Sequence, residues 1–200
     1  MPQRTSAFDS SSILIDETLD RLESTYTRVF GTLYPDYPNI IRSSGTMALE
    51  IIANSDALYH NVEHTIMVTL VGQEILRGKH LSEGKVTARE WVHFIVSLLC
   101  HDIGYVKNIC PGDNDNQAVI DDRGTIVDIP PGATGAFLTP FHVERGQIFV
   151  RNRFKEHPVI SAKVVQRNLE HTKFPVPEVD DEGGDTDYPG LVRAADLIGQ

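Results

Sequence analysis

Histidine and aspartate side chains in three short segments are the groups in this chain best suited to chemistry. His60 and His64 lie four residues apart in the first segment and would share one face if both were helical. The second segment carries the adjacent pair His101-Asp102, and the third carries Asp196. Mixed imidazole and carboxylate ligands suit a divalent metal ion of intermediate softness. We therefore predict a metal site, at which the ion would lower the pKa of bound water and make hydroxide available near neutral pH.

The residues around these groups form three motifs in a definite order. The first is Tyr-His-Asn-Val-Glu-His at 59–64, and the His-Asp pair at 101–102 follows an apolar run over 91–100. The third motif is Leu-Val-Arg-Ala-Ala-Asp-Leu at 191–197. An adjacent His-Asp pair alone arises often by chance, whereas its place between the other two motifs supports the metal interpretation. This order resembles the HD-domain superfamily of metal-dependent phosphohydrolases.

Within that superfamily, the motifs at 59–64 and 191–197 resemble the catalytic domain of cyclic-nucleotide phosphodiesterases and their bacterial relatives. The resemblance implies roles for particular residues. It makes His64, His101, Asp102 and Asp196 the metal ligands, and Asp102 a carboxylate that can bridge two ions. It makes His60 the general acid that protonates the leaving oxygen, a task suited to histidine. The implied cofactor is one or two divalent ions, chosen from Mn, Fe, Ni, Zn or Mg, with His60 and Asp102 as catalytic groups.

Two features leave alternatives open. The stretch His101-Asp102-Ile103-Gly104 resembles the bacterial cyclic-dinucleotide branch of the superfamily more closely than the cyclic-nucleotide branch, so the substrate is expected only to be a nucleotide or another small phosphate compound. Some HD branches build a second metal site from two further histidines between the His-Asp pair and the last aspartate. His142 and His171 lie in that interval, so the number of ions stays open.

Three functions compete on these residues. The leading hypothesis is hydrolysis of a phosphoester by water activated at the metal, with His60 as the proton donor. A di-iron oxygenase is the second, because that chemistry exists on the same fold with extra histidines. A non-catalytic ligand sensor is the third, and a complete set of ligands argues against it. His60 in its Tyr-His-Asn context favours hydrolysis.

Other polar groups allow a functional or an ordinary interpretation. Asn61 is a candidate either to support the site or to cap a helix, and Lys107 either holds phosphate or is exposed. The Asp113-x-Asp115 pattern is expected in a solvated loop. A basic cluster is expected to form a solvated helix face; it comprises Arg145, Arg151, Arg153 and Lys155.

Composition bounds the class of protein. Two hundred residues, 40% of them hydrophobic, suffice for a single domain with a substantial core, here expected over 1–200. Two cysteines and an N-terminus without an apolar segment predict a cytoplasmic location. The longest apolar run is too short for a bilayer.

A net charge of −10 argues against nucleic-acid polymers and anionic membranes as partners, and leaves a small phosphate compound. Much of this charge lies in 178–187, expected to be a solvated loop, and the oligomeric state stays open.

Apolar periodicity and capping residues predict an all-α fold, a single helical bundle of the HD type. A capping box at Thr87–Glu90 begins a buried central helix whose C-terminal end presents His101 and Asp102, with Gly104 as its stop signal. The last helix is still continuing where the sequence ends, which predicts further chain downstream. The other helices are expected over 11–30, 47–54, 61–77, 141–154, 158–170 and from 189 onward.

Residues 106–140 interrupt the helical pattern and are rich in Pro, Gly, Asp and Asn. Within them, 118–120 and 125–127 flank a Gly-containing turn, which predicts a small β-hairpin. Because this insertion follows the His101-Asp102 pair directly, we expect it to border the metal site and to influence substrate preference.

Overall fold

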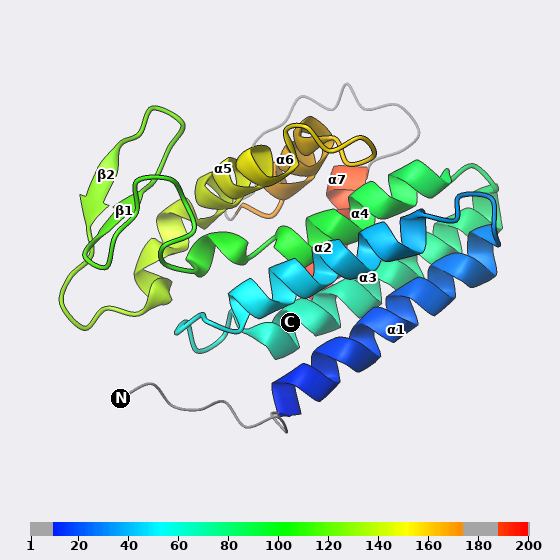
Figure 1. The fold of residues 1–200 in the computed structure, drawn as a ribbon, viewed down its shortest axis with the longest axis horizontal. Coiled ribbons are helices and arrows are strands. Elements are labelled where there is room, and N and C mark those ends of the chain that lie inside the picture. The colour runs from blue at the N-terminus through cyan, green and yellow to red at the C-terminus, as the bar shows by residue number, and fades with distance from the viewer. Residues whose placement is uncertain (1–9, 174–187, 200) are drawn as a thin grey trace.

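The computed structural model describes residues 10–173 and 188–199, and nearly all of its regular structure is helical (Figure 1). A single two-stranded sheet accompanies the helices in this part of the chain. The all-α fold predicted from periodicity is therefore confirmed. None of the helices described in these ranges is both long and apolar enough to cross a membrane. The acidic segment 178–187 lies outside the described residues.

Four long helices form the N-terminal half: α1 (Ser10–Phe30), α2 (Tyr37–Ile52), α3 (Val62–Glu83) and α4 (Ala88–Cys100). The helix α4 is central, because it contacts α2, α3, α6 and α7. Every side chain from 91 to 100 is buried, as its continuous apolar sequence requires. Thr87 and Glu90 form the predicted capping box at its start, each side chain bonding the other residue's backbone N–H. The capping box therefore fixes where α4 begins, and its buried side chains hold the helix in the core.

The boundaries of α2 and α3 differ from the sequence prediction. The helix α2 begins at Tyr37 rather than 47, because Pro38 occupies its first turn, where a missing N–H costs nothing. The prolines around 35–38 thus start this helix instead of separating two others. The helix α3 continues past Gly78 to Glu83 and ends at Gly84, which adopts the left-handed conformation with φ 65°.

The C-terminal half consists of the short helices η1 (Ile103–Tyr105) and η2 (Gly135–Phe141), followed by α5 (His142–Phe154), α6 (Ala162–Glu170) and α7 (Tyr188–Ile198). The helix α6 starts four residues later than predicted, since 158–161 are not helical. The helix α7 packs on α3 and α4. Gly72 of α3 permits this approach, because a Cβ there would lie only 3.0 Å from that of Ala195.

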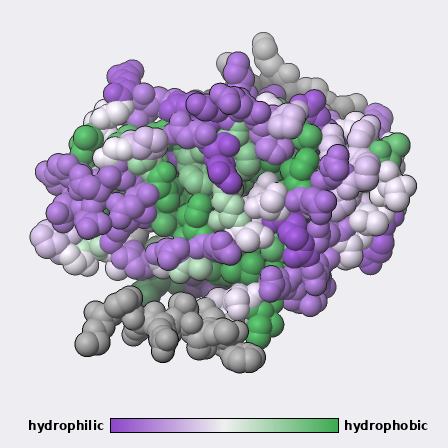
Figure 2. Space-filling model, viewed as in Figure 1, coloured by the Kyte–Doolittle hydropathy of each residue, from purple (hydrophilic) through white to green (hydrophobic). Residues whose placement is uncertain are grey.

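The predicted hairpin is present within the 106–140 insertion. The strand β1 (Gln117–Val119) pairs antiparallel with β2 (Ile126–Asp128), with Ala118 opposite Val127. The hairpin lies at one end of the molecule, beside α5 and away from the long helices α1 to α4 (Figure 1). On the face seen in Figure 2, hydrophilic residues predominate and apolar residues show between them.

Gly104 has a different function from the predicted helix stop. The helix α4 ends at Cys100, four residues earlier, and Gly104 lies within η1. A Cβ at Gly104 would overlap the carbonyl oxygen of His142 and lie 2.9 Å from the backbone nitrogen of Gly146. The glycine therefore permits η1 to pack directly against the backbone of α5. This contact fixes the segment that follows the His101-Asp102 pair.

Candidate metal centre

Three elements bring the predicted metal-binding side chains together. His64 lies in the first turn of α3, where the Asn61 side chain accepts a hydrogen bond of 3.0 Å from the His64 backbone N–H. Asn61 is thus the helix N-cap. His101 caps the C-terminal end of α4, with Asp102 immediately after it. Asp196 projects from α7.

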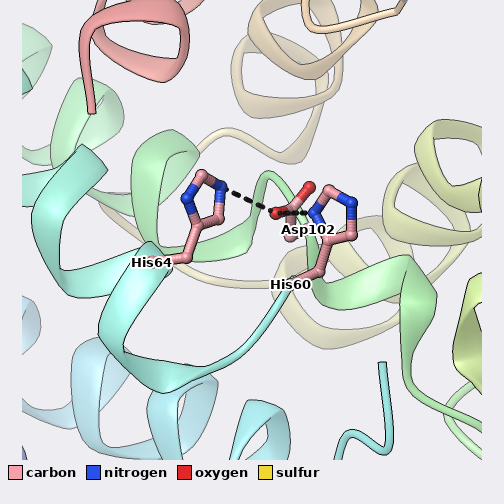
Figure 3. A group of neighbouring side chains, drawn as sticks. All are labelled: His60, His64 and Asp102. Atoms are coloured by element: carbon pink, nitrogen blue, oxygen red, sulfur yellow. Dashed lines mark hydrogen bonds and ion pairs between the residues drawn. The ribbon is translucent and has the colours of Figure 1, made fainter. Parts of the chain in front are cut away.

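The donor atoms of these four residues converge. The Nε2 atoms of His64 and His101 are 3.3 Å apart, and each lies 3.2 Å from Oδ2 of Asp102. Figure 3 shows the Asp102 carboxylate between the rings of His64 and His60. Its oxygen is therefore within reach of both imidazoles, from opposite sides.

Asp196 contributes the second carboxylate. Its Oδ1 atom lies 3.8 Å from Nε2 of His64 and 3.6 Å from Nε2 of His101. One donor atom each from His64, His101 and Asp196 all lie within 4.8 Å of one another, and the same holds for His60, His64 and Asp102. Both groups use His64, and because one imidazole nitrogen binds one ion, only one of the two groups can be filled at a time.

Burial and charge make this place attractive to a cation. His101 is fully buried, which alone would lower its pKa, but the negative charges of Asp102 and Asp196 raise the pKa to about 9. Burial opposes ionisation of Asp102 as well, yet the charge of His101 and hydrogen bonds from His101, His60 and His64 hold the pKa of its carboxyl well below the usual range. The two carboxylates therefore favour a positive charge on the His101 ring, and they would stabilise a bound metal ion in the same way.

The ring of His101 is oriented for ligation. Its Nδ1–H donates a hydrogen bond of 2.7 Å to the carbonyl oxygen of Leu98, one turn earlier in α4. This bond places a proton on Nδ1 and turns Nε2 toward His64 and the two carboxylates, where it would bind an ion once its own proton is displaced. Two imidazole nitrogens facing each other at close range, with two carboxylates beside them, form a donor set that fits a divalent ion of intermediate softness.

His60 lies beside this donor set and is not part of α3. It precedes the N-cap residue, so the expected common helix face with His64 is absent. Its Nδ1 atom lies 2.8 Å from Oδ2 of Asp102. Its ring stacks on Tyr105 with a centroid distance of 3.9 Å and an angle of 10°. Asp102 and Tyr105 thus fix the ring of His60 in position and in plane.

The further histidines of the sequence prediction lie elsewhere. His142 stacks on Tyr105 from η1 at 4.6 Å between centroids, and its Nδ1 atom lies 2.7 Å from the Thr139 carbonyl oxygen. Burial lowers its pKa. His171 ends α6. Within the described ranges, neither His142 nor His171 belongs to a group of three possible metal donors.

A cavity of about 450 Å³ opens beside the cluster. It contains groups that the sequence prediction did not select, of which Tyr105, Lys173 and Arg193 are the largest. Arg193 could have been found from its place one turn before Asp196, whereas Lys173 carries no motif signal. The cavity is lined by His60, Asp102, Tyr105, Thr139, His142, Thr172, Lys173, Arg193, Asp196 and Leu197.

Lys107 does not line this cavity. Its Nζ atom donates to Oδ2 of Asp56 at 2.8 Å and to the carbonyl oxygen of Ala133 at 2.6 Å. Both partners lie outside the metal cluster. Lys107 thus ties the insertion to the loop before α3, and the phosphate-binding interpretation has no geometric support.

Arg145 corrects the prediction of a solvated basic face. Its side chain is completely buried, whereas that of Arg151 is 42% exposed. The Arg145 guanidinium bonds both carboxylate oxygens of Asp113, at 3.1 and 2.9 Å. Asp113 is therefore the buried partner of an arginine and not a solvated loop residue. Nitrogen atoms of the same guanidinium reach the carbonyls of Gly104 and Val106, on either side of Tyr105.

The insertion borders the cavity only in part. Thr139 of η2 is a lining residue, but the hairpin strands contribute none. The expectation that the whole segment 106–140 borders the site is therefore wrong for the hairpin. Direct continuity with Asp102 places η1 at the site, while the Arg145–Asp113 pair holds the β1 end of the insertion against α5.

Comparison with known proteins gives one match. No curated protein and no solved structure matches the chain. A family model described as Npun_R2479-like matches residues 8–200, which include every donor of the candidate metal centre. The chain therefore belongs to the Npun_R2479-like family.

Proposed function

We propose that this protein is a metal-dependent phosphohydrolase that cleaves a phosphoester bond of a nucleotide or another small phosphate compound. The observation that carries the proposal is the convergence of His64, His101, Asp102 and Asp196 beside a cavity that His60 also lines. The order of the three motifs, which resembles the HD-domain superfamily, supports the same assignment. The proposed partner is small because a cavity of about 450 Å³ suits a small ligand.

The four ligands would hold a divalent ion, which supplies an activated water nucleophile and neutralises phosphate oxygens. The residues of the chain set the geometry around it. Asp102 has three partners, because the same oxygen atom faces His64 and His101 on one side and His60 on the other. Its carboxylate thus couples the position of His60 to that of the ligands.

His60 is the proposed general acid. Its Nδ1 atom is engaged with Asp102, so a proton on Nε2 is the one available to the cavity. That proton passes to the departing oxygen as the phosphorus–oxygen bond breaks, and the imidazole then regains a proton from water. Asp102 holds Nδ1 of His60 in place, and stacking on the Tyr105 ring limits rotation of the imidazole out of plane.

A test of the whole proposal begins with the purified protein, stripped of metal and reloaded with Mn, Fe, Ni, Zn or Mg in turn. We expect hydrolysis of phosphomonoesters or phosphodiesters with at least one of these ions. His64→Ala should lose both bound metal and activity. Elemental analysis with full metal content in that variant would remove the metal assignment.

The role of His60 is tested by comparing two substrates. His60→Ala should keep the metal and the fold but lose about 10²- to 10⁴-fold in rate on a substrate with a poor leaving group. A nitrophenyl ester departs without a proton and should lose far less. Equal losses on both substrates at full metal content would contradict the acid role, and loss of metal would make His60 a ligand. His171→Ala, outside the cavity, is the matched control.

A di-iron oxygenase is the second candidate. One donor group includes His60, and the Asp102 carboxylate lies between His60 and His64, where it could bridge two neighbouring ions. Iron loading accompanied by oxygen consumption, with no phosphoester hydrolysis, would favour this alternative. We also propose a cytoplasmic location, because Cys100 and Cys110 are buried and unpaired.

A further inference from the structure

Among the described residues, Arg193 is the cation of the cavity that has no protein partner. It lies on α7 three residues before Asp196, and residues with this spacing are neighbours, with Cβ atoms about 5–6 Å apart. Its side chain is half-buried and lines the cavity together with Asp196 and His60. No ion pair or hydrogen bond joins its guanidinium to another residue in 10–173 or 188–199. The charge of Arg193 is therefore available to a ligand.

Lys173, the other cation of the cavity, is neutralised by the protein. Its Nζ atom lies 2.8 Å from a carboxylate oxygen of Glu144 and 2.6 Å from one of Glu170. Burial lowers the pKa of this ammonium, but these two carboxylates outweigh burial and raise it. Lys173 is thus charged, but its ammonium group is already paired with two carboxylates of the protein. Arg193 differs from it in having no such partner.

We infer that Arg193 binds the phosphoryl group of the substrate, and that this group is a terminal one, as in a phosphate monoester. The inference rests on the proposed function and narrows its substrate class. A guanidinium presents parallel N–H donors that match two phosphate oxygens at once. In a protein with net charge −10, an unpaired arginine beside the candidate metal centre is suited to an anion.

The count of oxygens favours a terminal phosphoryl group. A monoester has three non-bridging oxygens, so one can face the metal ligands while two remain for the arginine. A diester has only two, so a two-point contact with Arg193 would force one oxygen to serve the arginine and the ion together. The arrangement of a metal centre and an arginine on one helix face therefore suits a monoester better than a diester.

The experiment measures binding of inorganic phosphate to the metal-loaded protein by titration calorimetry. Arg193→Gln should weaken phosphate binding about 10- to 100-fold, since it removes charge-assisted hydrogen bonds. Arg193→Lys keeps the charge but not the paired donors, so its phosphate affinity should lie between those of the wild type and Arg193→Gln. Metal content and circular dichroism should stay unchanged in both variants. Arg167→Gln is the matched control, because Arg167 is exposed on α6 and outside the cavity.

Kinetics provide the second arm. With a monoester and a diester that share one leaving group, Arg193→Gln should lower kcat/KM about 10- to 100-fold for the monoester and several-fold at most for the diester. Equal losses would overturn the assignment to a terminal phosphoryl group. Unchanged phosphate affinity in Arg193→Gln, or no phosphate binding by the metal-loaded wild type, would overturn the role of Arg193 altogether.

The two proposals fail separately. If the wild type hydrolyses phosphoesters but Arg193→Gln binds phosphate and turns over monoesters normally, the hydrolase assignment stands and the Arg193 inference is wrong. If no phosphoester is cleaved with any metal, the hydrolase proposal fails. In that case, phosphate affinity that still depends on Arg193 would retain this residue as an anion site of a non-hydrolytic protein.

Discussion

Charged groups are buried in two regions of this molecule, around Arg145 and around Asp102, and their surroundings differ. The guanidinium of Arg145 has five N–H donors. Its nitrogen atoms make hydrogen bonds to two oxygens of Asp113 and to the carbonyls of Gly104, Val106 and Val119. Donors and acceptors match in number, so the network is complete without a further group.

The network around Asp102 is arranged differently. Imidazole nitrogens of His64 and His101 face each other at 3.3 Å, with the carboxylates of Asp102 and Asp196 beside them, and the cluster borders a cavity. Two imidazole nitrogens and two carboxylates thus converge on one place, and a metal ion could replace the protons that join them. A closed network of buried charges fixes structure, whereas an open one beside a cavity has both the charge and the room for a ligand.

The largest expected effect concerns the closed network. Arg145→Met should lower the free energy of unfolding by about 3–5 kcal/mol, because it leaves the buried Asp113 carboxylate without its counter-charge. Urea denaturation measures this loss. Arg151→Met is the control: its side chain is 42% exposed and pairs with Asp122, so a change of about 1 kcal/mol or less is expected. Similar losses in both variants would contradict the comparison.

A smaller effect is expected when a metal fills the open network. An ion at one hundred times its Kd should add about 2.7 kcal/mol to the free energy of unfolding. For a chain of this length, Tm should rise by about 5–10 °C. Calorimetric melting of chelated and reloaded protein measures the shift. Asp102→Asn should abolish the shift in Tm, whereas Arg151→Met should show it in full. An unchanged Tm in the reloaded wild type would contradict metal binding at the cluster around Asp102.

Acid provides a test of Asp113. Burial alone would raise its pKa, but hydrogen bonds from Arg145 and from the Val119 and Cys110 backbone lower it below the model-compound value of 3.8. A lowered pKa in the folded state contributes stability that is complete above the unfolded-state value and is lost as pH falls through the folded-state value. The free energy of unfolding should therefore fall below about pH 4. Asp113→Asn should be less stable at neutral pH and show a shallower acid slope, measured by urea denaturation at stepped pH.

The smallest effect is expected for the hairpin. Replacing 121–124 with a two-residue turn should leave metal content unchanged and KM within about twofold, since neither strand lines the cavity. The exposed turn makes mostly local hydrogen bonds, such as those from Arg123 and Thr125 to Asp121. A marked change in substrate preference would show that the insertion acts on the site through its tip.

The sequence by itself determined the features that depend on neighbouring residues. The capping box of Thr87 and Glu90 requires only a spacing of three, and the periodicity of 11–30 is that of the observed α1. The hairpin between 117 and 128 follows from its turn chemistry in the same way. The motifs also selected His64, His101, Asp102 and Asp196, which the structure brings within a few ångströms of one another.

Only the tertiary structure decided which charged side chains are buried and which groups they contact. Arg145 is far in sequence from its partners Gly104 and Val119, so no local pattern distinguished it from exposed Arg151. Lys173 and Arg193 likewise come from different elements and line one cavity. Two glutamates pair with Lys173, whereas no described residue pairs with Arg193. Burial and pairing depend on the approach of elements from distant parts of the chain. Residue type and spacing can therefore select side chains that converge in the fold, but they cannot tell a solvated arginine from a buried one that holds the fold together or from one that lines a cavity without a described partner.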